Sequence, residues 1–153
     1  MKAVIQRVKS AKLIIGGKVY SEIKQGLLVL LGIMKNDTFA SAEFLAKKIT
    51  DLRIFSDDDD KMNLSVKDID GEIMVVSQFT LCTDDKKSGN RPSFFMAEQP
   101  DRAKIIYEEF IGMCGGYYNR KKIRQGVFAA MMEISLVNDG PVTIILEKKN
   151  EET

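Results

Sequence analysis

The stretch SLVNDGPVTIIL (residues 135–146) decides how the last third of the chain is folded. Two apolar, β-branched runs flank residues 138–141 (NDGP), and the composition of this segment is typical of a turn between two strands. Pro141, however, opens the second run, where its missing N–H weakens a β-ladder. The segment therefore has two interpretations: the tip of a hairpin, or a device that presents backbone groups to a ligand.

Apolar patterns outside this stretch predict further strands and two main helices. Strands are expected over residues 2–8, 12–23 with a tight turn at Gly16-Gly17, 26–33, 71–81, 123–137 and 142–147. The run GLLVLLGI (26–33) is apolar throughout, as in a strand that is covered on both faces. Helices are expected over about 39–53 and from Pro100 to Gly115-Gly116. This order predicts an α+β fold, with two helices packed on a mostly antiparallel or mixed sheet.

Composition predicts a single, ordinary globular domain. The 153 residues are 44% hydrophobic and 29% charged, and 23 basic residues nearly balance 22 acidic ones. A net charge of +1 disfavours a strongly basic protein that binds nucleic acid without specificity, although a local basic patch is compatible with it. The N-terminus does not have the pattern of a signal peptide, and no apolar run is long enough to span a bilayer. We expect a cytoplasmic protein that does not bind membranes.

The residue types that are missing limit the chemistry. The chain has no histidine and two cysteines, Cys82 and Cys114, so Ser-His-Asp and Cys-His catalysis and the usual four-ligand zinc site are excluded. Residues 57–60 (DDDD) lack the alternating spacing of a calcium loop and are interpreted as a charged turn. We therefore expect no metal and no cofactor. A hydrolase of this composition must transfer protons through a carboxylate, a lysine, water or the substrate itself.

Three segments are candidate sites on their residues alone. In VVSQFTL (75–81), the polar Ser77, Gln78 and Thr80 either face solvent at a strand end or deliver polar groups and backbone N–H groups into a pocket. Basic residues cluster at 86–91 and at 120–124, where they either bind phosphates or are simply solvated. Cys82 follows the polar segment directly, but no imidazole is present to activate it. These residues alone do not define a reaction.

Taken together, the motifs resemble the D-aminoacyl-tRNA deacylase family. The resemblance covers about residues 1–147 as a single domain, and residues 148–153 are expected to be a flexible tail. It rests on IQRV (5–8), GLLVLLGI, RIFSDDDDKMNLSV, VVSQFTL, GNRPSF, PDRA and VFAAMMEISLVNDGPVT. Two of these segments, SQFTL and NDGPVT, resemble the paired signature motifs of the family in the right order. The resemblance implies a barrel-like, mostly antiparallel or mixed sheet with two helices.

The resemblance also implies an activity. Members of the family hydrolyse the ester between a D-amino acid and the 3′ end of tRNA, and they remove glycine from mischarged glycyl-tRNA. They are homodimers with the active site at the subunit interface. The implied mechanism needs no histidine, because the 2′-hydroxyl of the terminal adenosine assists the attack on the ester, while the protein positions the substrate and stabilises the oxyanion.

Site residues follow from the resemblance by position. Gln78, Phe79 and Thr80 are expected to act mainly through main-chain N–H groups, and Ser77 is expected to line the same wall. Gly140 and Pro141 from the partner subunit, joined by a cis bond, are expected to form the opposite wall and to reject L-aminoacyl esters. Arg7 is expected to support this Gly-Pro motif.

The sequence departs from the family pattern at three positions, and three alternative functions are considered. Gln125 stands where the family usually has threonine, Met131 where it commonly has an acidic residue, and Gln99 where serine is frequent. These positions concern the pocket edge and the start of a helix, not the class of reaction. The alternatives are a sister deacylase that edits another mischarged tRNA, a non-catalytic nucleic-acid-binding module, and a general esterase, which the missing histidine disfavours.

Overall fold

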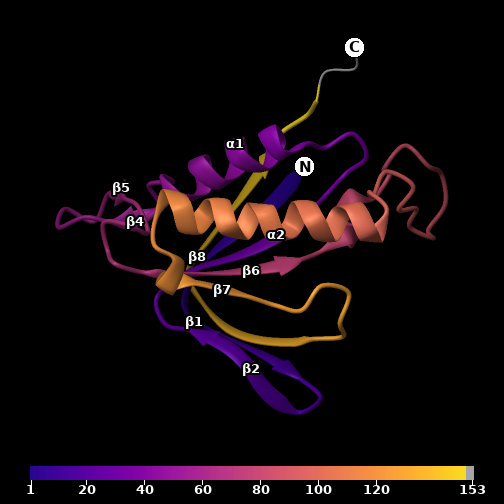
Figure 1. Ribbon diagram of the computed structural model, residues 1–153. Coiled ribbons are helices and arrows are strands. Elements are labelled where there is room, and N and C mark those ends of the chain that lie inside the picture. Colours follow the sequence, from indigo (N-terminus) through magenta and orange to yellow (C-terminus); the bar gives the residue numbers. More distant parts are fainter. Residues whose placement is uncertain (151–153) are drawn as a thin grey trace.

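A computed structural model describes residues 1–150, and their chain forms a mixed sheet covered by two long helices (Figure 1). The elements in chain order are β1 (Lys2–Ile15), β2 (Lys18–Ile23), β3 (Gly26–Gly32), α1 (Phe39–Thr50), β4 (Phe55–Ser56), β5 (Met62–Leu64), β6 (Glu72–Ser77), the 3₁₀ turn η1 (Phe79–Cys82), α2 (Pro100–Tyr117), the 3₁₀ turn η2 (Arg120–Lys122), β7 (Ile123–Gln125) and β8 (Glu133–Glu147).

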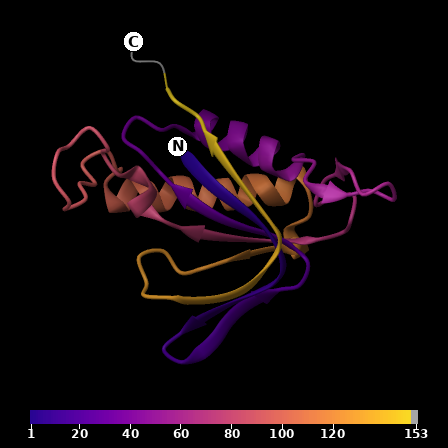
Figure 2. The same ribbon diagram turned by 180° about the vertical axis from the view of Figure 1, so that it is seen from behind.

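The long strand β1 organises the main sheet. It pairs antiparallel with β3 through residues 2–8 and with β2 through residues 11–15, while β8 pairs antiparallel along nearly its whole length. β3, β6 and β7 are parallel to one another. Both helices lie on one side, and the β1–β2 hairpin and the segment after β7 curve away beneath them (Figures 1 and 2). The predicted α+β fold with a mixed, barrel-like sheet is confirmed.

Two apolar clusters hold these layers together, and β3 contributes to both. Leu27, Val29 and Leu31 belong to the cluster that includes the inner faces of α1 and α2. The alternate residue Leu28 belongs to a second cluster on the other side of the sheet, inside its curl, with Leu13 and Met74 among its members. All of these side chains are almost fully buried. The prediction that residues 26–33 form a strand covered on both faces is confirmed for residues 26–32.

The NDGP segment is a bulge within one strand, so its interpretation as a turn between two strands was wrong. Val8 of β1 pairs with Asn138, and Gln6 pairs with Thr143, so that Arg7 alone faces the four residues 139–142. The chain does not reverse, because both flanking runs pair with the same strand in the same antiparallel direction. The extra residues leave the ladder; Gly140 and Pro141 are exposed, whereas Asp139 and Val142 are partly buried.

Several other expected boundaries needed correction. The strand predicted over 71–81 ends at Ser77, and η1 follows it. The run predicted as strand over 123–137 is interrupted, because residues 126–132 form a loop between β7 and β8. α1 ends at Thr50 instead of about residue 53. Helix α2 continues through Gly115-Gly116 to Tyr117; a Cβ on Gly115 would lie 2.7 Å from Cγ of Arg120, so close packing against η2 explains that glycine.

Both ends of the described chain are tied together beside α1. The Met1 ammonium lies 2.7 Å from Oδ1 of the buried Asp37, and Lys148 N–H donates to Met1 O at 2.9 Å. Asn150 donates through Nδ2 to Asn36 O at 2.6 Å. Of the tail expected to be flexible, residues 151–153 lie outside the described residues. Within residues 1–150, no helix has the length and apolarity needed to cross a membrane.

Candidate active site

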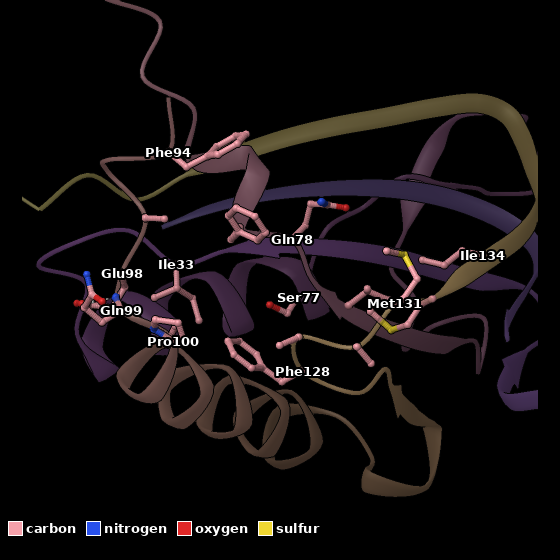
Figure 3. Close-up of a pocket in the computed structure, with 17 residues that line it drawn as sticks. Ile33, Ser77, Gln78, Phe94, Glu98, Gln99, Pro100, Phe128, Met131 and Ile134 are labelled. Carbon is pink, nitrogen blue, oxygen red and sulfur yellow. Dashed lines mark hydrogen bonds between the residues drawn. The ribbon is translucent and has the colours of Figure 1, made fainter. Parts of the chain in front are cut away.

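A cavity of about 710 Å³ opens where β6 ends, between the start of α2 and the loop that precedes β8 (Figure 3). Its lining is mostly apolar, with polar groups concentrated at the end of β6 and at the start of α2. The lining residues are Ile33, Val76, Ser77, Gln78, Phe79, Phe94, Ala97, Glu98, Gln99, Pro100, Ala103, Phe128, Ala129, Ala130, Met131, Met132 and Ile134.

The predicted SQFTL segment forms one wall of this cavity. Gln78 N–H still donates to Leu31 O of β3 at 2.8 Å, and η1 begins at the next residue. Because a helical turn leaves its first N–H groups without an internal acceptor, the N–H groups of Phe79 and Thr80 are available. Neither has a hydrogen-bond acceptor among residues 1–150. The change from strand to turn thus leaves two unused backbone donors beside the cavity.

The side chains of this segment divide between the cavity and solvent. Ser77, Gln78 and Phe79 line the cavity, whereas Thr80 does not. The Thr80 hydroxyl instead accepts a hydrogen bond from Nε2 of Gln78 and is exposed. The Phe79 ring is 57% exposed and packs edge-on against Phe94, with ring centroids 5.2 Å apart. These aromatic side chains form the rim of the opening.

A buried tyrosine fixes the end of β6 to the opposite wall. The Tyr107 hydroxyl on α2 lies 2.9 Å from Val75 O and 3.4 Å from Gly126 O, and Gly126 N–H donates to Val75 O at 3.1 Å. Burial raises the pKa of Tyr107, so the hydroxyl stays protonated and serves as a donor. Its ring also contacts Phe128 in the cavity wall, with centroids 5.8 Å apart. The end of β6, helix α2 and the loop after β7 are therefore held in fixed positions around the cavity.

Cys82 is not equipped to act as a nucleophile. Its side chain is buried, and Sγ contacts Ile33 O at 3.5 Å. Burial raises the pKa of the Cys82 thiol to about 11, so the reactive thiolate is scarce at neutral pH. Cys82 is therefore best explained as the buried packing residue at the end of η1.

The NDGP bulge lies apart from the cavity of its own chain. None of its residues lines the cavity, and both Gly140 and Pro141 are exposed. The bond between them is cis, and φ of Gly140 is +125°. Arg7 connects the bulge to the segment that follows α1. Its Nε donates to Asp139 O at 3.0 Å and lies 3.4 Å from Asp139 Oδ2. Its Nη1 donates to Ile54 O at 2.7 Å.

Apart from Met131 and Gln99, which were noted as departures from the family pattern, sequence reasoning did not identify the cavity residues at the start of α2 and in the loop after β7. The Glu98 carboxylate accepts a hydrogen bond from Gln99 N–H at 2.8 Å and forms an ion pair with Arg102 at the cavity edge. Pro100 was identified only as a helix start, and Gln99 makes no side-chain cap there. Met131, one of the noted departures, lines the cavity and is 91% exposed. Apolar residues carry no sequence signal that separates a cavity wall from a core.

The charged segments lie outside the cavity. The basic residues of 86–91 are on an exposed loop, and those of 120–124 surround η2, where Lys122 Nζ lies 3.3 Å from Asp70 Oδ2. Residues 57–60 form a turn: hydrogen bonds from Asn63 and from the Lys61 and Asp59 N–H groups lower the pKa of Asp57. In the described part of the chain, no group of three His, Cys, Asp or Glu side chains is arranged to hold a metal ion.

Relatives of known family match nearly the whole sequence. The sequence model of the family described as D-Tyr-tRNA(Tyr) deacylase matches residues 4–147. The D-aminoacyl-tRNA deacylase of Thermosipho africanus is 52% identical over 149 residues, which are 97% of this chain and 98% of the relative. The enzyme of the same name from Cytophaga hutchinsonii is 51% identical over 152 residues, which are 99% of this chain and 100% of the relative.

Two solved structures share the fold of this chain. A structure described as a c-Myc DNA unwinding element binding protein is 41% identical, with a TM-score of 0.92 over 98% of this chain and 100% of its own. A structure described as a probable eukaryotic D-amino acid tRNA deacylase shares the fold at 14% identity, with a TM-score of 0.79 over 95% of this chain and 97% of its own. The match along nearly all of the chain shows that this protein belongs to the D-aminoacyl-tRNA deacylase family and is a hydrolase.

Proposed function

We propose that the cavity at the end of β6 binds the aminoacylated terminal adenosine of tRNA, and that the enzyme hydrolyses D-aminoacyl and glycyl esters while sparing L-aminoacyl esters. The observation that carries this proposal is the pair of unused N–H groups of Phe79 and Thr80 beside a mostly apolar cavity. Backbone donors of this kind stabilise the oxyanion that forms when water adds to an ester carbonyl.

The substrate supplies the proton transfers in this proposal. Water adds to the ester carbonyl carbon, the carbonyl oxygen becomes an oxyanion near the two N–H groups, and the bond to the ribose 3′-oxygen then breaks. The neighbouring 2′-hydroxyl of the substrate relays the proton that water loses to the departing 3′-oxygen. This route is favoured because the chain has no histidine and the thiol of Cys82 is buried with a raised pKa. Positioning is the main contribution of the protein.

A second copy of the chain completes the site in this proposal. Gly140 and Pro141 are exposed and lie apart from the cavity of their own chain. On either side of the bulge, β8 also exposes two apolar side chains, Val137 at 52% and Ile145 at 65%, and β8 lies on the side of the molecule away from α2 (Figure 2). Pairing of two such faces in a homodimer would bury this apolar surface and bring each bulge to the cavity of the partner.

Selection against L-aminoacyl esters then depends on backbone atoms. The carbonyl groups of Gly140 and Pro141 accept hydrogen bonds from the α-ammonium of the substrate, and the same atoms occupy the direction that an L side chain would take. A glycyl ester has no side chain to clash, so it is accepted. Because this selection does not depend on recognition of the substrate side chain, the enzyme tolerates many D-amino acids. Arg7 supports this arrangement through its bonds to Asp139 and Ile54.

The direct test compares release of amino acid from three charged tRNAs. We expect the enzyme to hydrolyse D-tyrosyl-tRNA and glycyl-tRNA, and to hydrolyse L-tyrosyl-tRNA at least about 100-fold more slowly. The rates are measured as loss of acid-precipitable labelled amino acid under single-turnover conditions. Equal hydrolysis of the D and L esters would contradict the backbone selection, and hydrolysis of an L ester alone would favour a sister deacylase of different selectivity.

Thr80→Ala is expected to retain most of the deacylation activity. The Thr80 hydroxyl is exposed and contacts Gln78, and its N–H survives the substitution. We expect kcat to stay within about fivefold of wild type, whereas loss of a covalent nucleophile lowers kcat by roughly 10⁴-fold or more. Single-turnover rates are compared with circular dichroism of both proteins. A loss of that larger size in a folded variant would support a covalent mechanism instead.

The alternative of a non-catalytic nucleic-acid-binding module is raised by the description of one structural relative as a DNA unwinding element binding protein. The near-zero net charge of this chain disfavours it. It predicts nucleic-acid affinity without release of amino acid from any of the three charged tRNAs, so the same assay distinguishes it from the proposed deacylase.

A further inference from the structure

An exposed aromatic side chain lies beside the rim of the cavity with no role in the site described above. The Phe95 ring is 67% exposed, and the Lys35 Nζ lies 3.4 Å from its centroid. The ammonium group therefore occupies one face of the ring in a cation–π contact and leaves much of the remaining ring surface open to solvent. We refer to these two residues as the Phe95–Lys35 platform.

Backbone hydrogen bonds fix this platform to the end of β3. Ala97 N–H donates to Phe94 O at 3.0 Å and closes a turn that contains Phe95. Lys35 N–H donates to Met96 O at 2.9 Å, and Glu98 N–H donates to Ile33 O at 3.0 Å. The residues on both sides of the platform, Phe94 and Ala97, line the cavity. The backbone that carries the ring is thus fixed beside the cavity, because Phe95 directly follows the wall residue Phe94.

The surroundings of the platform are basic. Residues 83–95 project from the body of the molecule near the start of α2 (Figure 1). This loop and the neighbouring Lys35 contribute four cationic side chains, Lys35, Lys86, Lys87 and Arg91, against two carboxylates, Asp84 and Asp85. None of the four cations forms an ion pair with a carboxylate among residues 1–150. An exposed aromatic ring within a net positive region is the combination that binds single-stranded nucleic acid.

We propose that the exposed surface of Phe95 stacks on the base of the nucleotide that precedes the terminal adenosine, and that the Lys35 ammonium contacts the phosphate between these two nucleotides. This inference rests on the proposed function, because it takes the cavity as the site of the aminoacylated adenosine. A strand that leaves the cavity past Phe94 meets Phe95 as the next residue. A single-stranded RNA end supplies both the flat base and the phosphate that the platform suits.

The test uses two substrates that differ only beyond the terminal adenosine: D-tyrosyl-tRNA and 3′-O-D-tyrosyl-adenosine. Phe95→Ala and Phe95→Leu are expected to raise KM for the tRNA about tenfold, because leucine keeps the apolar volume but not the stacking surface. Neither variant should change kcat/KM for the adenosine ester, and Phe95→Trp should keep the wild-type KM for the tRNA. Lys35→Gln should lower the slope of log KM against log salt by about 1.

Phe44 provides a matched control. It is also an exposed phenylalanine, at 46%, with the Lys148 ammonium 5.1 Å from its ring centroid, but it lies on α1 and does not line the cavity. Phe44→Ala should leave KM for the tRNA unchanged. An unchanged KM in Phe95→Ala, or an equal loss on both substrates, would overturn the platform while wild-type deacylation still supports the proposed function. Failure of the wild-type enzyme to hydrolyse either ester would instead reject the proposed function.

Discussion

Replacing Gly140 by alanine is expected to lower the rate of D-aminoacyl-tRNA deacylation about 100-fold, because a displacement of about 1 Å at a positioning group has an effect of that size. The φ angle of Gly140 is +125°, a region that L side chains rarely adopt. An added Cβ would also lie 3.0 Å from Cγ2 and N of Val142 and 3.2 Å from Nη2 of Arg7. The bulge must therefore shift, and the carbonyl groups proposed to bind the α-ammonium shift with it.

Gly17→Ala is the matched control for backbone strain. Gly17 also has a positive φ, +78°, but it lies in the β1–β2 turn with no atom within 4 Å of an added Cβ. Both substitutions should lower the free energy of unfolding by about 1 kcal/mol or more, measured by urea denaturation. Only Gly140→Ala should slow deacylation. An equal rate in both variants would show that the bulge does not position the substrate.

Mixing two inactive variants tests whether the bulge acts on the partner subunit. Ala130→Trp fills the cavity but leaves the bulge intact, whereas Gly140→Ala leaves the cavity intact. After subunit exchange, half of the dimers carry one variant of each kind, and each of these has one cavity opposite an intact bulge. About a quarter of the wild-type activity should therefore return in a two-fold symmetric dimer. No recovery after verified exchange would place the bulge and cavity of one active site in the same subunit.

The bulge also shows what local sequence patterns can and cannot predict. Composition identified residues 138–141 as a break in an apolar run, and this is correct. Whether the chain reverses at such a break depends on the strand with which the flanking runs pair. Here that strand is β1, more than a hundred residues earlier in the chain, so that no local pattern contains the answer. The strand in the run 26–33 was easier to predict, because burial on both faces of a strand leaves every position apolar.

The site residues also divide into those that local sequence patterns predict and those that they do not. Ser77 and Gln78 were recognisable because polar residues interrupt a buried strand, and the resemblance to the family added Phe79. The strand was nevertheless predicted to continue to residue 81, because apolar Phe79 and Leu81 fit a strand as well as they fit the 3₁₀ turn that replaces it. Phe128 and Met132 line the cavity through a loop that was predicted as strand. Tertiary contacts, such as those of Tyr107, determine where that loop lies.

A substrate that lacks the 2′-hydroxyl of the terminal adenosine is expected to lose about 100-fold or more of its enzymatic deacylation rate, the usual contribution of a proton-transfer group. The chain has no histidine, Cys82 is buried with a pKa of about 11, and the Thr80 hydroxyl only contacts an amide. Among residues 1–150, Glu98 is the one carboxylate in the cavity lining, and it is paired with Arg102, so it is poorly placed to replace the missing hydroxyl.

The measurement compares D-tyrosyl-tRNA ending in adenosine with the same tRNA ending in 2′-deoxyadenosine. Each enzymatic rate is divided by the rate of spontaneous hydrolysis of the same ester, because the 2′-hydroxyl also affects the ester in water. Uncharged tRNA of each kind, used as a competitor, shows whether binding is retained. If the two esters are accelerated equally, the substrate is not its own proton relay. The two N–H groups of Phe79 and Thr80 would then have to act together with a protein base, and Glu98 would be the first carboxylate to replace.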